Sequence, residues 1–170
     1  MRLSFLLTLL PGVLFCCTLA HAFPAEVLSV HDGDSITARR VEAKREKPHK
    51  VRIYGIDCPE LGQPFGEEAR DLAKQVLDGK TVEIVPAQKG KSYKREVGGI
   101  VLVSDMIVIQ DALVSAGLAW VDDRFCKLPV CDLWRLHQRE ARVARRGLWA
   151  DEAAVPPWTW RKMQRSPRKK

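Results

Sequence analysis

Residues 51–60 read Val-Arg-Ile-Tyr-Gly-Ile-Asp-Cys-Pro-Glu, a β-branched run that ends in two carboxylates. β-branched and aromatic residues favour strands, and the glycine and the following acid mark a break. We therefore expect a strand over residues 50–56, with Arg52 on the strand and Asp57 and Glu60 just beyond its end.

A second short segment, His-Asp-Gly-Asp-Ser at residues 31–35, adds Asp34 between two further strand-like stretches. Hard carboxylate oxygens suit a hard divalent cation such as Ca²⁺. A planar guanidinium can grip two oxygens of one phosphate. Carboxylates beside an arginine in a basic chain suggest an enzyme that cuts nucleic acid.

The rest of the chain shows strand patterns first and helical patterns later. Short β-branched runs bounded by turn residues predict further strands at residues 25–30, 35–41, 81–86 and 97–103. Apolar residues at helical spacing predict helices over 65–77, 109–114 and 133–146, each followed by glycine. Five strands and about three α-helices predict an α+β fold built on an OB-type β-barrel.

The first residues have the pattern of an export signal. A positive start, Met1-Arg2, precedes an apolar run to Leu19, and Ala20-His21-Ala22 is a small-residue cleavage site. We expect cleavage after Ala22, a secreted or periplasmic protein, and no stable membrane association afterwards. The apolar run is also long enough for an uncleaved membrane anchor.

Removal of residues 1–22 leaves one ordinary domain with three cysteines. In an oxidising compartment, Cys126 and Cys131 are a plausible disulfide around a small loop. Cys58 is then the best candidate for the unpaired thiol.

Positive charge is in excess, with 28 Lys and Arg against 21 Asp and Glu. It gathers in three clusters, at residues 39–50, 89–95 and 161–170. Such clusters attract polyanions, although a basic tail alone is as often solvated surface. We expect residues 23–160 to form the domain and residues 161–170 to be a disordered basic tail. Pro156-Pro157 should begin an extended segment whose tryptophans dock on the body.

These motifs together resemble the staphylococcal nuclease (thermonuclease) family, in particular its small exported bacterial members. The resemblance runs from about Glu26 to Arg161 and includes further motifs at 93–95, 112–119, 145–149 and 156–160. It implies a Ca²⁺ site formed by Asp34, Asp57 and the backbone carbonyl of Cys58.

The same resemblance implies roles for the neighbouring residues. Glu60 matches the general base or water-positioning residue, and Arg52 and Arg95 match the two arginines that grip the scissile phosphate. Asp32 would orient the metal ligands without binding the metal itself. Tyr93 would contact the nucleotide. The implied reaction cleaves the 5′ P–O bond of DNA or RNA with little sequence specificity, leaving 3′-phosphate and 5′-hydroxyl ends.

Three departures from the family pattern bear on this expectation. The family's Asp-x-Tyr-Gly-Arg stretch reads Lys-Ser-Tyr-Lys-Arg at residues 91–95, and Cys58 replaces a threonine. Asp122 and Asp123 stand near the place of aromatic residues that contact the nucleoside, where acids would weaken phosphodiester binding or change preference. None of these departures removes a catalytic residue. The sequence therefore favours a nuclease over a non-catalytic OB-type nucleic-acid-binding module. For the oligomeric state we expect a monomer.

Overall fold

A computed structural model describes most of the chain after the apolar run that ends at Leu19. The described residues are 22–43, 45, 47–87, 91–92, 95–97, 99–103 and 107–165, without the side chains of 91–92, 95–97, 100 and 102–103. The expected signal residues 1–21 and Tyr93 therefore lie outside the described residues. No helix within the described ranges is long and apolar enough to cross a membrane.

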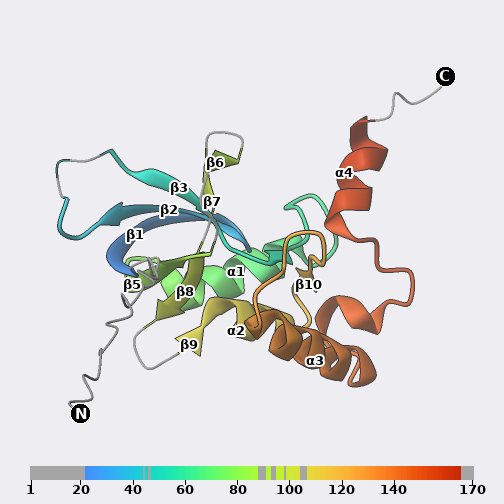
Figure 1. Cartoon of the computed structure of the whole chain (residues 1–170). Helices are drawn as coiled ribbons and strands as arrows, with labels where there is room; N and C mark the ends of the chain where they lie inside the picture. Colours follow the sequence, from blue (N-terminus) through green and yellow to red (C-terminus); the bar gives the residue numbers. More distant parts are fainter. Residues whose placement is uncertain are drawn as a thin grey trace, which may run out of the picture.

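Ten strands in the described part of the chain form two sheets, which Figure 1 shows in outline. They are β1 Phe23–Asp32, β2 Ser35–Arg40, β3 His49–Arg52, β4 Ile56–Asp57, β5 Thr81–Pro86, β6 Lys91–Ser92, β7 Arg95–Val97, β8 Gly99–Val103, β9 Ile107–Val108 and β10 Trp120–Val121. The larger sheet has the order β6-β7-β3-β2-β1-β5-β8-β9, and β10 pairs with β4 in the smaller one. All pairs are antiparallel except β3 with β7.

The long strand β1 lies at the middle of the larger sheet, and its shape curls the sheet. It pairs with β2 on one side and β5 on the other. The pairing with β2 shifts register between Val27 and Ser29 and again between Val30 and Asp32. Because such bulges bend a strand and increase its twist, β1 and β2 wrap around the apolar side chains that they share.

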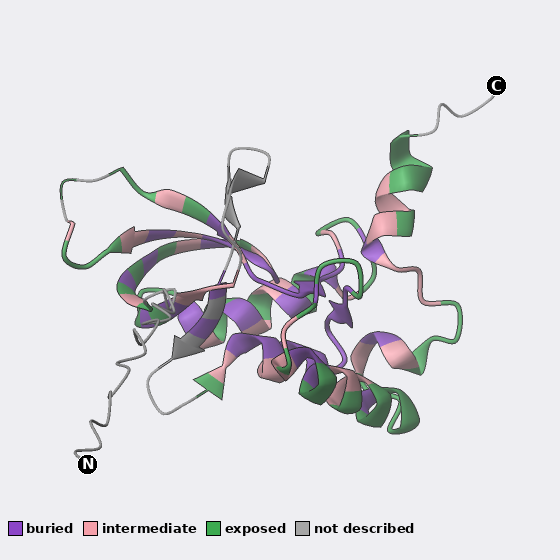
Figure 2. Cartoon of the chain, viewed as in Figure 1, coloured by how far each residue is buried: buried purple, intermediate pink, exposed green. Residues whose placement is uncertain are grey.

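Four α-helices and one 3₁₀ turn complete the described part of the fold. They are α1 Gly66–Leu77, α2 Ile109–Ser115, α3 Val130–Val143, the 3₁₀ turn η1 Gly147–Ala150 and α4 Pro157–Arg165. Figure 2 shows that α1 and α2 turn buried residues inward, whereas α3 is exposed on its outer side. The α+β class and a curled, largely antiparallel sheet of OB-like form are thus confirmed.

The five predicted strands correspond to β1, β2, β3, β5 and β8, which are the longer strands of the sheet. One prediction needs correction, because the run 50–56 is not continuous. It breaks after Arg52, and Gly55 has a φ of 77° before β4 begins. A side chain at Gly55 would meet the Cys126 Sγ and the Trp134 ring, so only glycine fits this bend.

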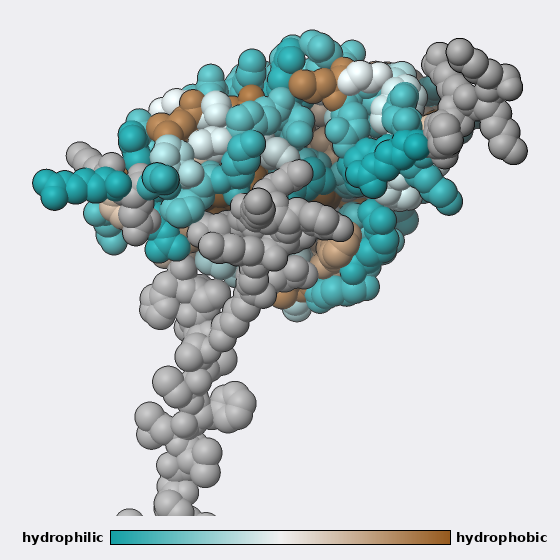
Figure 3. Space-filling model, turned by 90° about the horizontal axis from the view of Figure 1, so that it is seen from above, coloured by the Kyte–Doolittle hydropathy of each residue, from teal (hydrophilic) through white to brown (hydrophobic). Residues whose placement is uncertain are grey.

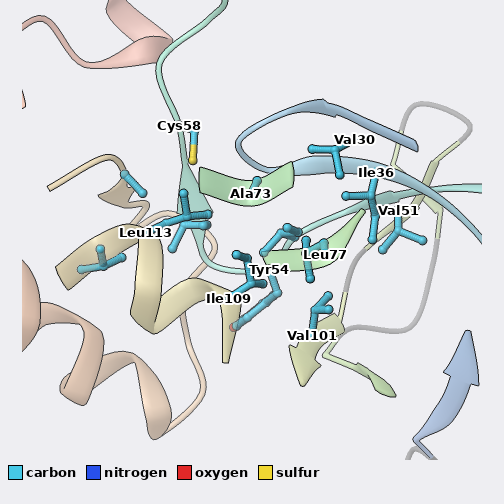
Figure 4. Close-up of a cluster of buried hydrophobic side chains, with 14 of the residues drawn as sticks. Val30, Ile36, Val51, Tyr54, Cys58, Ala73, Leu77, Val101, Ile109 and Leu113 are labelled. Carbon is cyan, nitrogen blue, oxygen red and sulfur yellow. The ribbon is translucent and has the colours of Figure 1, made fainter. Parts of the chain in front are cut away.

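A single apolar core lies between the curled sheet and the helices. Ala69, Ala73 and Leu77 project from α1 at helical spacing and are fully buried. Figure 4 shows Leu77 and Ala73 close to Val30, Ile36 and Val51 of the sheet, with Ile109 and Leu113 of α2 on the other side. Apolar burial of this extent is the main force that holds the sheet and helices together.

The disulfide Cys126–Cys131, expected from the sequence, is present with a Cα–Cα distance of 5.7 Å. It joins the loop after β10 to the first turn of α3, beside the fully buried Trp134. Cys58 is the free cysteine of the described residues and is buried.

The C-terminal segment corrects a second expectation. Residues 157–165 form helix α4, which begins at a proline, instead of an extended tail. Proline suits the first helical position because its fixed φ fits and its missing N–H would have had no partner. The helix runs across the boundary that we expected at residue 160, and residues 166–170 lie outside the described part.

Candidate functional site

The turn between β1 and β2 positions Asp34. Its backbone N–H donates to the Asp32 carboxylate at 3.1 Å, and its carbonyl accepts the Ile53 N–H at 2.8 Å. A Cβ at Gly33 would lie 2.7 Å from the Cys58 Sγ and 3.0 Å from the Ala69 Cβ. Glycine at this position therefore lets the turn pack against α1 and places Asp34 inside the protein.

The pairing of β4 with β10 positions the second carboxylate. Asp57 ends β4 opposite Trp120, and it is as buried as Asp34, each with 1% of its surface exposed. The next N–H along the chain, that of Cys58, donates to the Asp34 carboxylate at 2.7 Å. Backbone pairing and this hydrogen bond bring the two segments predicted from the sequence into direct contact.

Arg52 bridges the two buried carboxylates. It lies opposite Ser35 in the β2–β3 ladder, and its guanidinium contacts Asp34 Oδ1 through Nη1 and Asp57 Oδ1 through Nη2, the latter at 2.6 Å. Burial lowers the pKa of Arg52, but the negative charges of Asp34 and Asp57 outweigh it and raise that pKa above its ordinary value. Arg52 is therefore permanently charged, and each of its two terminal nitrogens is held by a buried carboxylate.

The Asp34 carboxyl group is buried, and burial disfavours its charged form. Burial raises the pKa of Asp34 well above its usual value, and the charges of Asp32 and Asp57 act in the same direction, against Arg52. Carboxylates that are buried together repel one another and favour a bound cation. The charge imbalance at this cluster therefore fits a positively charged ligand.

Glu60 lies beside the buried pair, on a tight turn before α1. Its carbonyl accepts the Gln63 N–H at 2.8 Å, and its N–H donates to Gln63 Oε1 at 3.3 Å. The Gln63 side chain, 6% exposed, also donates to the carbonyl of Val155. Glu60 itself keeps 39% of its side chain exposed, so it faces both the buried carboxylates and solvent.

A residue that we did not predict completes the cluster. Arg161 of α4 donates to Asp57 Oδ2 at 2.6 Å and to Glu60 Oε1 at 2.6 Å. The hydrogen bonds to Asp57 and Glu60 raise the pKa of Arg161, with burial acting against them. In the sequence, its sole distinguishing mark is its place directly after Trp-Thr-Trp, which gives no hint of a partner 101 residues away.

The expected metal ligands fit Ca²⁺ in their chemistry. Asp34 and Asp57 supply buried hard oxygens, and a backbone carbonyl at Cys58 would be a third. Within the described ranges, no three His, Cys, Asp or Glu side chains are arranged to hold a metal ion.

The second predicted arginine is placed by its backbone alone. Strand β7, which begins at Arg95, runs parallel to β3 and puts Val97 opposite Arg52. Arg95 therefore belongs to the strand next to the one that carries Arg52. Its side chain, like the whole of Tyr93, is outside the described part of the structure.

The acids at 122 and 123 have arginine partners. Asp122 is 5% exposed and binds Arg124 through two hydrogen bonds of 2.6 and 2.8 Å. Asp123 accepts a hydrogen bond of 2.8 Å from Arg135. Each acid therefore has an arginine as its nearest positive partner.

The Cys58 thiol faces the interior of the protein. The residue is 3% exposed, and burial together with the negative charge of Asp34 raises the pKa of the thiol well above its usual value. Since reactive cysteines are exposed thiolates, this one is a packing group.

The described surface of the protein is largely polar. Figure 3 shows a face that is mostly hydrophilic, with small separate apolar patches. At the end of the larger sheet where β2 and β3 connect, the basic residues Arg40, Arg45, Lys47 and Lys50 are exposed. A surface of this kind favours a polyanionic ligand over an apolar one.

Comparison with known proteins supports one family throughout. A family model for staphylococcal nuclease homologues matches residues 50–151, a range that contains Arg52, Asp57 and Glu60. An uncharacterized endonuclease of Escherichia coli O157:H7 is 37% identical over 135 residues, which cover 79% of this chain and 82% of that protein. Protein ParB of Escherichia coli is 32% identical over 144 residues, which cover 81% of this chain and 78% of that protein.

A plant relative is similar over one part of its length. The probable staphylococcal-like nuclease CAN2 of Oryza sativa subsp. japonica is 34% identical over 143 residues, 84% of this chain but 35% of that protein. The family model covers residues 50–151, which contain Arg52, Asp57 and Glu60, and each of these relatives aligns with about four fifths of the chain. The chain therefore belongs to the staphylococcal nuclease family.

Proposed function

We propose that this protein is a Ca²⁺-dependent phosphodiesterase that hydrolyses DNA and RNA with little sequence specificity. The observation that carries the proposal is the cluster at Asp34, Arg52 and Asp57, with Glu60 at its edge. Two buried carboxylates beside a fixed guanidinium suit a metal next to a phosphate, and nucleic acid is the polyanion that carries such phosphates.

In this proposal Asp34, Asp57 and the Cys58 carbonyl hold the cation, and Asp32 steadies Asp34 through its backbone N–H. Ca²⁺ supplies positive charge beside the phosphate and lowers the pKa of water near it. Arg52 and Arg95 would be the two arginines that bind the scissile phosphate. Arg52 is already fixed by hydrogen bonds, so it needs no reorganisation to bind charge that develops on the phosphate oxygens.

Hydrolysis requires a proton acceptor near the attacking water. Glu60 is half exposed at the rim of the cluster, where it can orient a water molecule and accept its proton. The water oxygen forms a bond to phosphorus and its proton passes to Glu60, while the P–O5′ bond breaks and the departing oxygen takes a proton from solvent. The products have 3′-phosphate and 5′-hydroxyl ends.

The wider setting follows the same reasoning. We propose that the mature protein begins at Phe23, acts outside the cytoplasm as a monomer, and folds as a five-stranded OB-type barrel with added short strands. Tyr93 would contact the nucleotide. The exposed basic side chains of the β2–β3 connection would attract the substrate backbone.

Digestion of plasmid DNA and of unstructured RNA by the purified mature chain tests this proposal. We expect cleavage with Ca²⁺, none with EDTA, and fragments that a kinase can label directly at the 5′ end. Ends that need phosphatase treatment before labelling would overturn the assigned bond. Undiminished cleavage in EDTA would overturn the metal role, and tight binding without cleavage would identify a binding module instead.

A further inference from the structure

The guanidinium of Arg161 occupies the outer side of the carboxylate cluster. Both oxygens of Asp57 contact it, at 2.6 Å for Oδ2 and 3.1 Å for Oδ1, and Glu60 Oε1 lies 2.6 Å away. Arg52 covers the opposite side through Asp57 Oδ1. Every carboxylate oxygen of Asp57 is therefore already bound to a positive charge.

Helix α4, which carries Arg161, buries little apolar surface against the body. Pro157 is its one buried residue. The Trp158 ring lies edge-on to Trp120 with centroids 6.5 Å apart, and the Arg124 guanidinium lies 5.0 Å from the Trp158 ring centroid. The later residues of the helix are exposed, as Figure 2 shows. Segments with so little buried apolar surface can detach without disturbing the core.

A second link joins the same two regions. Gln63 holds the Glu60 turn through its side-chain oxygen and donates to the Val155 carbonyl just before α4. Movement of α4 would therefore change the position of Glu60 through two contacts, the ion pair with Arg161 and the hydrogen bonds of the Gln63 amide.

We propose that Arg161 is an internal competitor of the divalent cation for Asp57, so that cation binding and the docking of Arg161 on Asp57 and Glu60 exclude each other. The inference rests on the proposed function, because it takes Asp57 as a metal ligand. A cation at Asp57 would face the like charge of Arg161 across a shared carboxylate. Release of Arg161 would free Glu60 to face water and would leave a guanidinium free at the rim.

Calcium titration by isothermal calorimetry, on metal-free protein at low ionic strength and without nucleic acid, tests the competition. Arg161→Gln should bind Ca²⁺ at least tenfold more tightly than the wild type. Arg165→Gln removes the same charge one turn further along α4, where the side chain is exposed, and should change the affinity less than threefold. Thermal unfolding followed by circular dichroism will verify that each variant is folded.

Hydrogen exchange supplies a second readout that does not depend on any variant. In wild-type protein, Ca²⁺ should increase the exchange of the α4 amides from residue 161 to 165, while the amides of α1 stay protected. Slower or unchanged exchange in α4 would overturn the release.

The outcomes separate this inference from the proposed function. Equal or weaker Ca²⁺ binding by Arg161→Gln overturns the competition and leaves the metal site standing. An equal gain in Arg165→Gln likewise overturns it, because general charge would then explain the effect. Absence of Ca²⁺ binding in all three proteins overturns the metal site and the competition together.

Discussion

Gly66 packs directly against the backbone carbonyl of Glu60. A Cβ at residue 66 would overlap that oxygen and the carbon that bears it. Glycine at the first position of α1 thus allows the chain to fold back on itself and fixes the turn that presents Glu60.

This relationship predicts a substitution that damages the site without touching a reactive group. Gly66→Ala should shift the Glu60 turn and lower kcat/KM for DNA by about tenfold or more, since small displacements of catalytic groups are costly. Gly62→Ala, on the same turn, is the control, because a Cβ there has no atom within 4 Å. Equal activity of the two variants in a DNA digestion assay would contradict the assigned role of the turn.

Arg52→Lys separates the two-point hydrogen bonding of the Arg52 guanidinium from its positive charge. Lysine keeps the positive charge between Asp34 and Asp57 but cannot bond both carboxylates and a phosphate in one plane. We expect kcat to fall by about 10²–10³, the usual cost of losing a preorganised donor. Arg39→Lys changes an arginine whose recorded partner is Glu26 on the surface, and it should leave kcat unchanged. A comparable loss in both variants would argue against a specific role for Arg52.

Asp34→Asn should stabilise the metal-free protein at neutral pH. Burial raises the folded-state pKa of Asp34, so its contribution to the free energy of unfolding is greatest below the unfolded pKa and falls as the pH rises through the folded one. Asparagine removes this loss and still accepts the Cys58 N–H. Denaturant unfolding in EDTA should show a gain for the variant at pH 8 that shrinks towards pH 4. A gain that grows as the pH falls would have the wrong sign.

The thiol count of the mature chain follows from burial and the disulfide. In native protein at pH 8, Cys58 should not react with a disulfide reagent, because burial raises its pKa and blocks access. Unfolding without reductant should expose one thiol, and Cys58→Ser should expose none. Three thiols in unfolded, non-reduced protein would mean that Cys126 and Cys131 are not joined.

Much of the fold was predictable because the relevant signals are local. Apolar residues at helical spacing, each followed by a glycine, located α1, α2 and α3 to within a few residues. The strand at 25–30 was likewise predicted from short-range sequence, although its bulges were not. The family pattern predicted that Asp34 and Asp57 belong to one site, and in the structure Arg52 contacts both.

The remaining features depend on partners that are distant in the sequence. Pro156-Pro157 favoured an extended chain, and the docking of α4 depends on Gln63 and Trp120, which are remote from it. The ion pair of Asp123 depends on Arg135, twelve residues later on another element. Arg161 was missed for the same reason, since its contacts with Asp57 and Glu60 depend on the position at which α4 packs against the body.

The central claim is that Glu60, beside the buried pair of carboxylates, serves a Ca²⁺-dependent cleavage of nucleic acid. The most direct test measures initial rates on one end-labelled DNA with wild type, Glu60→Gln and Glu68→Gln, in Ca²⁺ and in EDTA. Glu68 is exposed on α1 and serves as the matched control. We predict a rate about 10²-fold lower for Glu60→Gln, a wild-type rate for Glu68→Gln, and no cleavage in EDTA. Full activity of Glu60→Gln in Ca²⁺, or of the wild type in EDTA, would contradict the account.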